Sequence, residues 1–288
     1  MKLLVLSPQK QSTTTNMIIS EAKNLFSSVS LVPIKNVAIK LGDVLGIYYG
    51  NDDLTSYDYL LPRIDSVRAR FGYQVMNFFD MVGMKKPYKA ETILIAHNKF
   101  ATIYELKKAG LPVPETFYTA AKSSANDIIN KLEFPAVIKL VSSFGGKGVM
   151  FLESKEAASS VVKTLDLLKQ ELMLEEYVKN PGEDIRIFVI GQDFVAMKRV
   201  AALGEKRANI YAGGKGKPYR PSSEELELAL KAADVIDAKI CGIDLVEGPN
   251  GPEIIEANIN PGIVGISKAT GVNVARRIAQ FCYDEAKA

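Results

Sequence analysis

Cysteine and histidine are scarce in this chain of 288 residues, and their scarcity excludes several kinds of site. The two cysteines, Cys241 and Cys282, cannot form a disulfide framework or a zinc site built of thiolates. The only histidine, His97, rules out a zinc-binding helix with two histidines, and a histidine-activated nucleophile would have to use it. Its neighbours Ala96 and Asn98 indicate a helix end, where a surface position is expected. Chemistry should therefore depend on carboxylates, lysines, arginines and backbone amides, the groups that handle phosphate.

Long apolar runs and an excess of one charge are also missing. No stretch reaches the ~18 apolar residues of a membrane span, and the N-terminal sequence MKLLVLSPQK becomes polar too early for a secretory signal. With 36 Lys and Arg against 33 Asp and Glu, the net charge of +3 does not argue for nucleic acid. The chain is 47% hydrophobic and 24% charged, which is typical of a globular protein. We therefore expect a cytoplasmic protein that binds neither membranes nor nucleic acid directly.

Strand and helix patterns divide the chain into three predicted α+β parts, residues 1–90, 91–178 and 179–288, each large enough for a subdomain. The first boundary follows from a linker pattern at 85–89 that contains Pro87. Strands are expected at 2–7, 57–64, 136–141, 149–153, 172–175, 184–190, 193–200, 240–246 and 253–258. Helices are expected at 12–26, 67–82, 98–110, 123–132, 155–168, 224–236 and from 274 onward.

Three of these helices have apolar faces that should pack on a core. The faces consist of Val67, Phe71, Val75, Phe78, Phe79 and Val82 in one helix, Phe100, Ile103 and Tyr104 in the next, and Val274, Ala275, Ile278, Ala279 and Cys282 in the last. Asn98 is expected to cap the second of them, and Gly110 to end it.

Two strands near the C-terminus, ICGIDLV and EIIEAN, carry the strongest functional signal. The turn residues EGPNG lie between them, so a hairpin centred on Asn250 is expected, with Val246 opposite Ile254 and Asp244 opposite Glu256. Asn258 then shares a face with Glu256. Opposed carboxylates repel each other, and oxygen-only ligands suit Mg²⁺ or Mn²⁺ better than zinc. A metal site is therefore favoured over a solvated sheet face.

A second signal is the glycine-rich loop SSFGGKG, which follows an apolar strand interrupted by Lys139. Glycines allow backbone amides to surround phosphate oxygens, and Lys147 adds positive charge. The spacing is not that of a P-loop. A simple hairpin turn is as good an interpretation of the loop by itself, and Lys139 and the loop together favour a phosphate site.

The third signal is LEEYVKNPGEDIR, in which an apolar strand leads into Glu175 to Val178 and then a Pro-Gly turn. Backbone at such a crossing can offer a donor and an acceptor to an adenine edge. Asp184 and Arg186 share a strand face by alternation. From spacing alone, an acidic surface turn is the better interpretation.

In this order, the three signals resemble the ATP-grasp superfamily and, within it, the RimK-type glutamate ligases. The likeness extends from about Tyr57 to Glu285 and is most specific in GIDLV at 242–246 and EANINPGIVGISKATGVNVA at 256–275. It implies an ATP-grasp fold of α+β subdomains, with ATP between the last two and an N-terminal α/β pre-ATP-grasp domain. It also implies ATP-driven amide formation. The family adds glutamate to the C-terminus of a ribosomal protein, and close relatives act on an amino-group carrier protein or on pterin and deazaflavin cofactors.

The resemblance also assigns roles to residues. For ATP it implies phosphate lysines, a lid, an adenine hinge, a ribose contact and groups at the transferred phosphate: Lys99, Lys139, Ser142, Gly145, Gly146, Lys147, Glu175, Glu176, Tyr177, Val178, Asp184, Arg207 and Asn209. Arg207, Lys139 and Arg199 are the expected catalytic residues. Asp244, Glu256 and Asn258 are the expected ligands of Mg²⁺ or Mn²⁺, with two ions implied. Arg63 and Asn260 are expected on the substrate side, Arg63 as a carboxylate clamp.

The sequence departs from the family in two places. Where the family has Asn-Leu-His-Arg-Gly-Gly, residues 209–214 are NIYAGG, so Ala212 replaces an arginine whose charge Lys215, Lys217 or Arg220 could supply. The loop GGKG is also more basic than in ribosomal-protein ligases. Both departures affect which acceptor is expected more than they affect the expected ATP chemistry.

Three functions remain open at this point. The first is the addition of glutamate to a protein or peptide C-terminus, in a homodimer or homotetramer as the resemblance implies. The second is the same chemistry on a small cofactor, on a carrier protein or with another amino acid. The third is a nucleotide sensor without ligase activity, against which the full set of expected ATP and metal residues argues. A dinucleotide dehydrogenase is not expected, because no glycine fingerprint follows the first strand.

Overall fold

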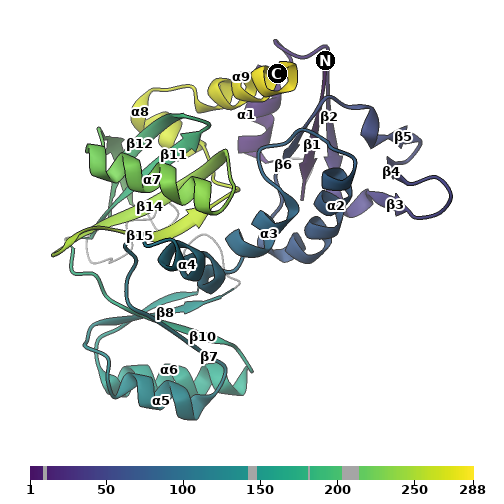
Figure 1. Cartoon of the computed structure of the whole chain (residues 1–288). Helices are drawn as coiled ribbons and strands as arrows, with labels where there is room; N and C mark the ends of the chain where they lie inside the picture. Colours follow the sequence, from purple (N-terminus) through teal and green to yellow (C-terminus); the bar gives the residue numbers. More distant parts are fainter. Residues whose placement is uncertain (9–11, 142–147, 181, 203–213) are drawn as a thin grey trace.

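The computed structural model describes residues 1–8, 12–141, 148–180, 182–202 and 214–288. Figure 1 shows three α/β parts, each with its own sheet, and places the helix α4 between the central and the C-terminal sheets. Within the described ranges, no helix combines the length and the apolar character needed to cross a bilayer.

The N-terminal part is built on a short parallel sheet in the order β2-β1-β6. The predicted strand β1, Lys2–Ser7, is confirmed with its bounds, and its residues Leu3 to Leu6 are fully buried, as expected of a strand covered on both faces. The other elements are β2 (Ser28–Pro33), β6 (Tyr59–Pro62), α1 (Thr13–Ala22), α2 (Ala69–Met81) and α3 (Ala90–Ala96), with a small sheet of β3 (Ala38–Lys40), β4 (Gly46–Tyr49) and β5 (Asp52–Asp53). Three short 3₁₀ turns lie at Ile34–Asn36, Leu54–Ser56 and Ser66–Arg68.

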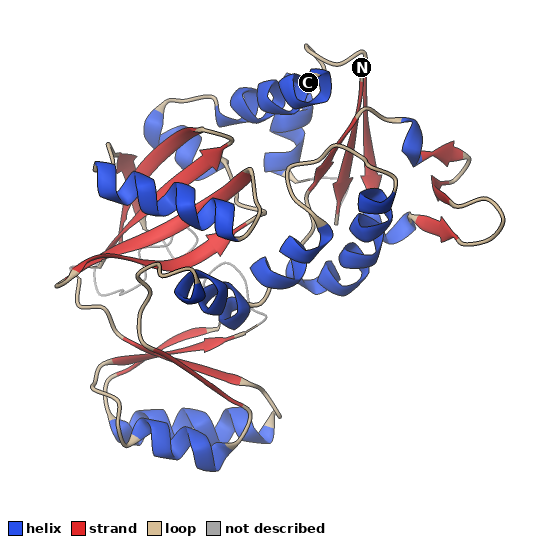
Figure 2. Cartoon of the chain, in the orientation of Figure 1, coloured by secondary structure: helices blue, strands red, loops and turns tan. Residues whose placement is uncertain are grey.

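The central part is an antiparallel sheet in the order β7-β10-β8-β9. Figure 2 shows two helices, α5 and α6, lying side by side on one face of this sheet, and α4 on the other side. The elements are α4 (Lys99–Lys108), β7 (Thr116–Thr119), α5 (Lys122–Ile129), β8 (Ala136–Leu140), β9 (Val149–Leu152), α6 (Lys155–Leu167) and β10 (Leu172–Glu176). Asn98 caps α4 as predicted, since its side chain accepts a hydrogen bond from the amide of Ala101.

The C-terminal part is an antiparallel sheet in the order β13-β12-β11-β14-β15, with α7 across one face. Its elements are β11 (Glu183–Ile190), β12 (Asp193–Val200), β13 (Lys215–Pro218), α7 (Ser223–Val235), β14 (Ile240–Gly248), β15 (Gly251–Asn258), α8 (Val264–Thr270) and α9 (Val274–Lys287). β14 pairs with β11 although α7 separates them in sequence, so residues of β11 and β15 lie on either side of β14.

The last helix packs on the first sheet. In Figure 1, α9 lies beside α1, and the two chain ends are close together. The predicted apolar face of α9 is confirmed, because Ile278, Ala279 and Cys282 are fully buried. They share one core with Leu3 and Val5 of β1.

Two other predicted helix faces are only partly correct. Val75, Phe78 and Phe79 of α2 are buried, but Val67, Phe71 and Val82 are exposed. Val67 lies in the 3₁₀ turn before the helix, and Val82 is its C-cap, so neither follows the helical spacing of the stripe. In α4, Ile103 is buried as predicted, whereas Tyr104 is 56% exposed.

Candidate active site

The hairpin β14–β15 brings Asp244 and Glu256 opposite each other, as the sequence predicted. Ile243 opposite Ala257 and Gly242 opposite Asn258 follow the same predicted register, but between Asp244 and the turn the register was predicted wrongly. A bulge after Asp244 leaves Ile255 without a place in the pairing, so Leu245 lies opposite Ile254, and Val246 lies opposite Glu253. The error arises because one extra residue in β15 shifts every pair between the bulge and the turn.

Asp244 is buried and ion-paired with two arginines. Arg186 is its cross-strand neighbour on β11, and its Nε and Nη2 atoms donate to both carboxylate oxygens at 2.6 Å. Arg199 on β12 donates from Nη2 to Oδ2 of Asp244 at 2.7 Å. These three bonds leave Asp244 about one of the four lone-pair positions of a carboxylate.

Arg199 also binds Asp184, its cross-strand neighbour, through Nε and Nη2. The result is a buried row of two aspartates and two arginines whose formal charges cancel. Burial raises the pKa of Asp184 to about 6, since Arg199 does not fully offset the loss of solvent and Asp244 adds repulsion. At Asp244, burial acts in the same direction, but Arg186 and Arg199 outweigh it and lower the pKa to about 2.

Glu256 has a much more open environment. Its side chain is 34% exposed, and its Oε1 forms a long ion pair with Nζ of Lys99, at 3.9 Å. Lys99 is the first residue of α4, the helix that lies against β15. The phosphate lysine and the metal ligand expected from the sequence are therefore neighbours.

Lys139 approaches the same strand from the central sheet. Its Nζ forms an ion pair with Glu175 on β10 and donates to the carbonyl of Ile255 at 3.4 Å. Ile255 is the residue left over at the bulge, which turns that carbonyl toward the central part. Glu175 is 2% exposed, and its Oε1 has no hydrogen-bond partner among the described residues. A buried acceptor without a donor is costly, so this atom is a natural partner for a ligand N–H.

The predicted hinge, Glu175 to Val178, leads from β10 toward β11. The amide of Glu176 already donates to the carbonyl of Glu115, and the Tyr177 ring packs edge-on against Phe151 with centroids 5.8 Å apart. A cavity of about 160 Å³ lies against Glu176, Tyr177 and Val178 and reaches the β14–β15 turn.

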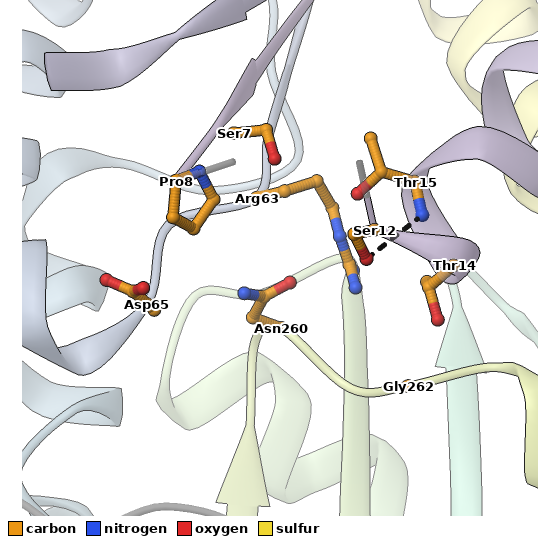
Figure 3. Close-up of a pocket in the computed structure, with 9 residues that line it drawn as sticks. All are labelled: Ser7, Pro8, Ser12, Thr14, Thr15, Arg63, Asp65, Asn260 and Gly262. Carbon is orange, nitrogen blue, oxygen red and sulfur yellow. Dashed lines mark hydrogen bonds between the residues drawn. The ribbon is translucent and has the colours of Figure 1, made fainter. Parts of the chain in front are cut away.

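The two predicted substrate residues meet in another cavity, of about 180 Å³ (Figure 3). Arg63, at the end of β6, is 5% exposed and donates from Nη2 to the carbonyl of Pro261 at 2.9 Å. Asn260 follows β15 and donates to the carbonyl of Ile64 at 3.2 Å. The amide of Asn260 donates to Oδ1 of Asn258, which connects this cavity to the expected metal ligands.

The metal-site prediction can be tested on donor chemistry. In the described ranges, no three His, Cys, Asp or Glu side chains gather in a group able to hold a metal. The expected set has only two acids plus an amide, and Asp244 is largely engaged by arginines. Glu256, the amide oxygen of Asn258 and the remaining lone pair of Asp244 still offer only oxygen ligands, which fits Mg²⁺ or Mn²⁺ when a nucleotide supplies further oxygens.

Several expected residues lie outside the described residues, namely Ser142, Gly145, Gly146, Lys147, Arg207 and Asn209. The candidates for replacing the family arginine, Lys215, Lys217 and Arg220, are exposed on or just after β13.

Arg186 is the residue that sequence reasoning missed. Its alternation with Asp184 was visible, but its pairing with Asp244 depends on the long-range contact between β11 and β14. His97 ends α3 as predicted, yet its ring is half-buried, with Nε2 3.0 Å from the carbonyl of Ile64, so the expected surface position was wrong.

Known proteins are similar to this chain along nearly its whole length. Residues 96–282 match the family model described as the RimK-like ATP-grasp domain, and residues 1–93 match the RimK PreATP-grasp domain. A probable alpha-L-glutamate ligase of Thioalkalivibrio sulfidiphilus is 32% identical over 100% of this chain and 97% of its own length. A protein of the same description from Nitrosococcus oceani is 32% identical over 98% and 95%.

Solved structures share the fold. A RimK domain protein ATP-grasp from Sphaerobacter thermophilus superposes with a TM-score of 0.76 and 19% identity, over 98% of this chain and 99% of that chain. The ATP-grasp ligase PsnB, in complex with a minimal precursor, Mg and ADP, gives 0.76 and 15% over 99% and 97%.

Proposed function

The chain belongs to the RimK-like ATP-grasp family of ATP-dependent ligases that form carbon–nitrogen bonds, and from this we propose that it adds L-glutamate to the C-terminal carboxylate of a protein or peptide. The observation that carries the proposal is the meeting of Lys99, Lys139 and Glu256 beside Asp244. Glutamate as the amino acid is supported by relatives described as probable alpha-L-glutamate ligases.

The proposed reaction has two steps. An oxygen of the acceptor carboxylate forms a bond to the γ-phosphorus of ATP while the bond to the β–γ bridging oxygen breaks, which gives an acyl phosphate and ADP. The amino nitrogen of glutamate then bonds to the acyl carbon, and the carbon–oxygen bond to phosphate breaks. The proton lost from nitrogen leaves with the phosphate. No covalent bond to the protein is needed, so the contribution of the chain is alignment and charge.

Each described residue then has a role. Lys99 and Lys139 bind phosphate oxygens, because both cations lie at β15, Lys99 3.9 Å from Glu256 and Lys139 3.4 Å from the Ile255 carbonyl. The unpaired Oε1 of Glu175 accepts an N–H from the adenine side of the nucleotide. Glu256, Asn258 and the free lone pair of Asp244 bind up to two Mg²⁺ or Mn²⁺ ions. When bound, such an ion neutralises charge on the phosphate oxygens.

A direct test uses the full-length protein with ATP, Mg²⁺, L-glutamate and a panel of peptides with free C-termini. We expect ADP release that depends on both the peptide and glutamate, and a glutamyl mass increment at the peptide C-terminus by mass spectrometry. A second panel of pterin and deazaflavin cofactors and amino-group carrier proteins tests the alternative acceptors. ADP release with a mass increment only in that second panel would overturn the proposed acceptor, and no increment in either panel would overturn the proposed reaction.

A further inference from the structure

Three charged side chains form a row across the C-terminal sheet. Arg186 on β11, Asp244 on β14 and Glu256 on β15 are successive cross-strand neighbours, so their side chains lie on one face of the sheet. At Glu256 this row meets Lys99, the lysine that begins α4. Asp244 therefore lies between an arginine and the acid with which it is expected to share a metal ion.

Arg186 occupies the atoms of Asp244 that a metal ion would use. Its Nε and Nη2 atoms donate to Oδ1 and Oδ2 at 2.6 Å, so one guanidinium engages both carboxylate oxygens. Oδ2 also accepts a hydrogen bond from Arg199. The lone pair that remains is on Oδ1, where the positive charge of Arg186 repels a cation. Arg186 and a divalent cation are therefore competitors for the same carboxylate.

Of the two arginines at Asp244, Arg186 is the one less firmly held. The side chain of Arg199 is 4% exposed and also binds Asp184. The side chain of Arg186 is 13% exposed, and within the described ranges both of its hydrogen bonds go to Asp244. Arg186 can therefore exchange Asp244 for another anion without leaving a second carboxylate unpaired.

The charges of the site favour such an exchange only when a nucleotide is present. Among the described residues, the ion pairs of the site join four cationic and four anionic side chains, namely Lys99, Lys139, Arg186, Arg199, Glu175, Asp184, Asp244 and Glu256. This set has no net charge with which to attract a dication by itself. The phosphates of ATP bring several negative charges, which attract the ion and offer the guanidinium a new partner.

We propose that Arg186 is a positioning residue that withholds Asp244 from a divalent cation until a phosphate of the nucleotide engages the guanidinium. The proposal rests on the function proposed above, in which ATP and the metal ion meet at Asp244 and Glu256. It explains why a carboxylate expected to bind a metal receives a two-pronged hydrogen bond from an arginine on the neighbouring strand. It also makes metal binding and nucleotide binding reciprocally coupled.

The first test titrates the full-length protein with Mn²⁺ alone and follows the free ion by its electron paramagnetic resonance signal. Arg186→Met keeps a long side chain but removes every donor, which leaves Asp244 with its bond from Arg199. We expect this variant to bind Mn²⁺ about tenfold to a hundredfold more tightly than wild type, the range for a charge-assisted hydrogen bond that no longer has to be broken. A purely structural arginine would give no gain in affinity when it is removed. Equal or weaker Mn²⁺ binding by Arg186→Met would overturn the proposal.

The role of the nucleotide is tested by repeating the titration with a saturating non-hydrolysable ATP analogue. In wild type the guanidinium then has a phosphate partner, which methionine cannot replace. Arg186→Met should therefore no longer bind Mn²⁺ more tightly than wild type. An advantage of the variant that persists with the analogue would show that the nucleotide does not engage Arg186.

Two further variants identify the carboxylate. Combining Arg186→Met with Asp244→Asn removes one charge of each sign, and the gain in Mn²⁺ affinity should disappear. A gain that survives in the double variant would place the ion elsewhere and contradict the proposal. Arg277→Gln is the matched control, because Arg277 forms an exposed ion pair with Asp193 of the same sheet. It should leave Mn²⁺ affinity unchanged, and a gain equal to that of Arg186→Met would mean that only the overall charge matters.

A conservative variant covers the case in which Arg186→Met does not fold. Arg186→Lys keeps the charge but replaces the forked pair by a single point contact, so its Mn²⁺ affinity should rise less than that of Arg186→Met. An ion that binds only the folded chain stabilises it, so Mn²⁺ should raise the urea midpoint of either variant more than that of wild type. The same midpoint shift in wild type and Arg186→Lys would count against the proposal.

This proposal and the proposed function can fail separately, since the titration with Mn²⁺ alone needs no nucleotide, glutamate or peptide. If Arg186→Met binds Mn²⁺ more tightly but no acceptor is modified, the role of Arg186 stands and the proposed reaction fails. If peptides are glutamylated but Arg186→Met binds Mn²⁺ no more tightly than wild type, the reaction stands and the role of Arg186 is overturned.

Discussion

Asp244 and Glu256 lie opposite each other on neighbouring strands, yet their surroundings differ completely. Asp244 is 2% exposed and receives three hydrogen bonds from Arg186 and Arg199. The side chain of Glu256 is 34% exposed, and within the described part of the chain its ion pair is the long one with Nζ of Lys99 at 3.9 Å. Glu256 therefore has more coordination capacity to spare than Asp244, which keeps about one free lone-pair position. The resemblance assigns the same metal-binding role to both acids, but their contacts differ. Asp244 mainly neutralises Arg186 and Arg199, whereas most of the Glu256 carboxylate remains available to a ligand.

The most direct way to break this comparison is Glu256→Gln. We expect peptide- and glutamate-dependent ADP release to fall about a thousandfold or more, since metal-mediated charge stabilisation contributes several kcal/mol to the transition state. The free energy of unfolding, measured in urea, should change by less than about 1 kcal/mol, because the partly exposed ion pair with Lys99 is weak. A variant with most of its activity would refute the metal role of Glu256.

Asp244→Asn should lower the stability of the fold much more than Glu256→Gln does. Removal of one partner from a buried ion-paired network typically costs about 3–5 kcal/mol, because Arg186 and Arg199 would keep their charges without full compensation. The free energy of unfolding, measured in urea, should fall by at least about 3 kcal/mol. A loss as small as that of Glu256→Gln would show that the two acids are equivalent after all.

The ion pair of Lys139 and Glu175 combines the two situations, because Lys139 is expected to bind ATP while it also neutralises a buried carboxylate. Lys139→Met should weaken ATP binding about tenfold and also destabilise the fold, since it leaves the buried Glu175 carboxylate unpaired. Adding Glu175→Gln should restore about 1 kcal/mol or more of stability without restoring ATP affinity. Calorimetry with ATP and urea unfolding of both variants separate the two effects. Additive stability losses would argue that the ion pair has no energetic role.

The smallest effect is expected at His97, whose charge, unlike those of the arginines, depends on pH. Burial lowers the pKa of His97, so the unfolded chain takes up the proton more readily than the folded one. Stability should therefore decrease as pH falls below the unfolded pKa of about 6.5. His97→Gln should reduce the difference between urea midpoints at pH 7.5 and 5.5 by a small amount. An unchanged difference would show that the ring titrates normally.

Local patterns in the sequence predicted much of this structure. The apolar run of β1, the Asn98 cap and the buried face of α9 depend on neighbouring residues, and all three are confirmed. The position of Asp244 opposite Glu256 also follows from a short hairpin. The strands β2 and β7 were missed, because most of their residues are not buried and show no clear alternation.

What the sequence could not predict depends on long-range pairing. The contact of Arg186 with Asp244 exists because β11 lies beside β14, across the whole of α7. Likewise, the approach of Lys139 to Ile255 requires the bulge in β15 and the closeness of the central sheet. The roles expected for residues within 142–147 and 203–213, which lie outside the described residues, stay predictions.

The position of α9 has a consequence for synthesis on the ribosome. Leu3, Val5 and Leu61 of the first sheet pack on Ile278 and Cys282, which are translated more than two hundred residues after β6. The strands of the first sheet are therefore made long before α9, and until α9 follows, α1 covers their apolar face only in part. A nascent chain without α9 would expose apolar surface of the first sheet, which chaperones bind. A truncation before residue 274 would therefore destabilise the first sheet as well as remove α9.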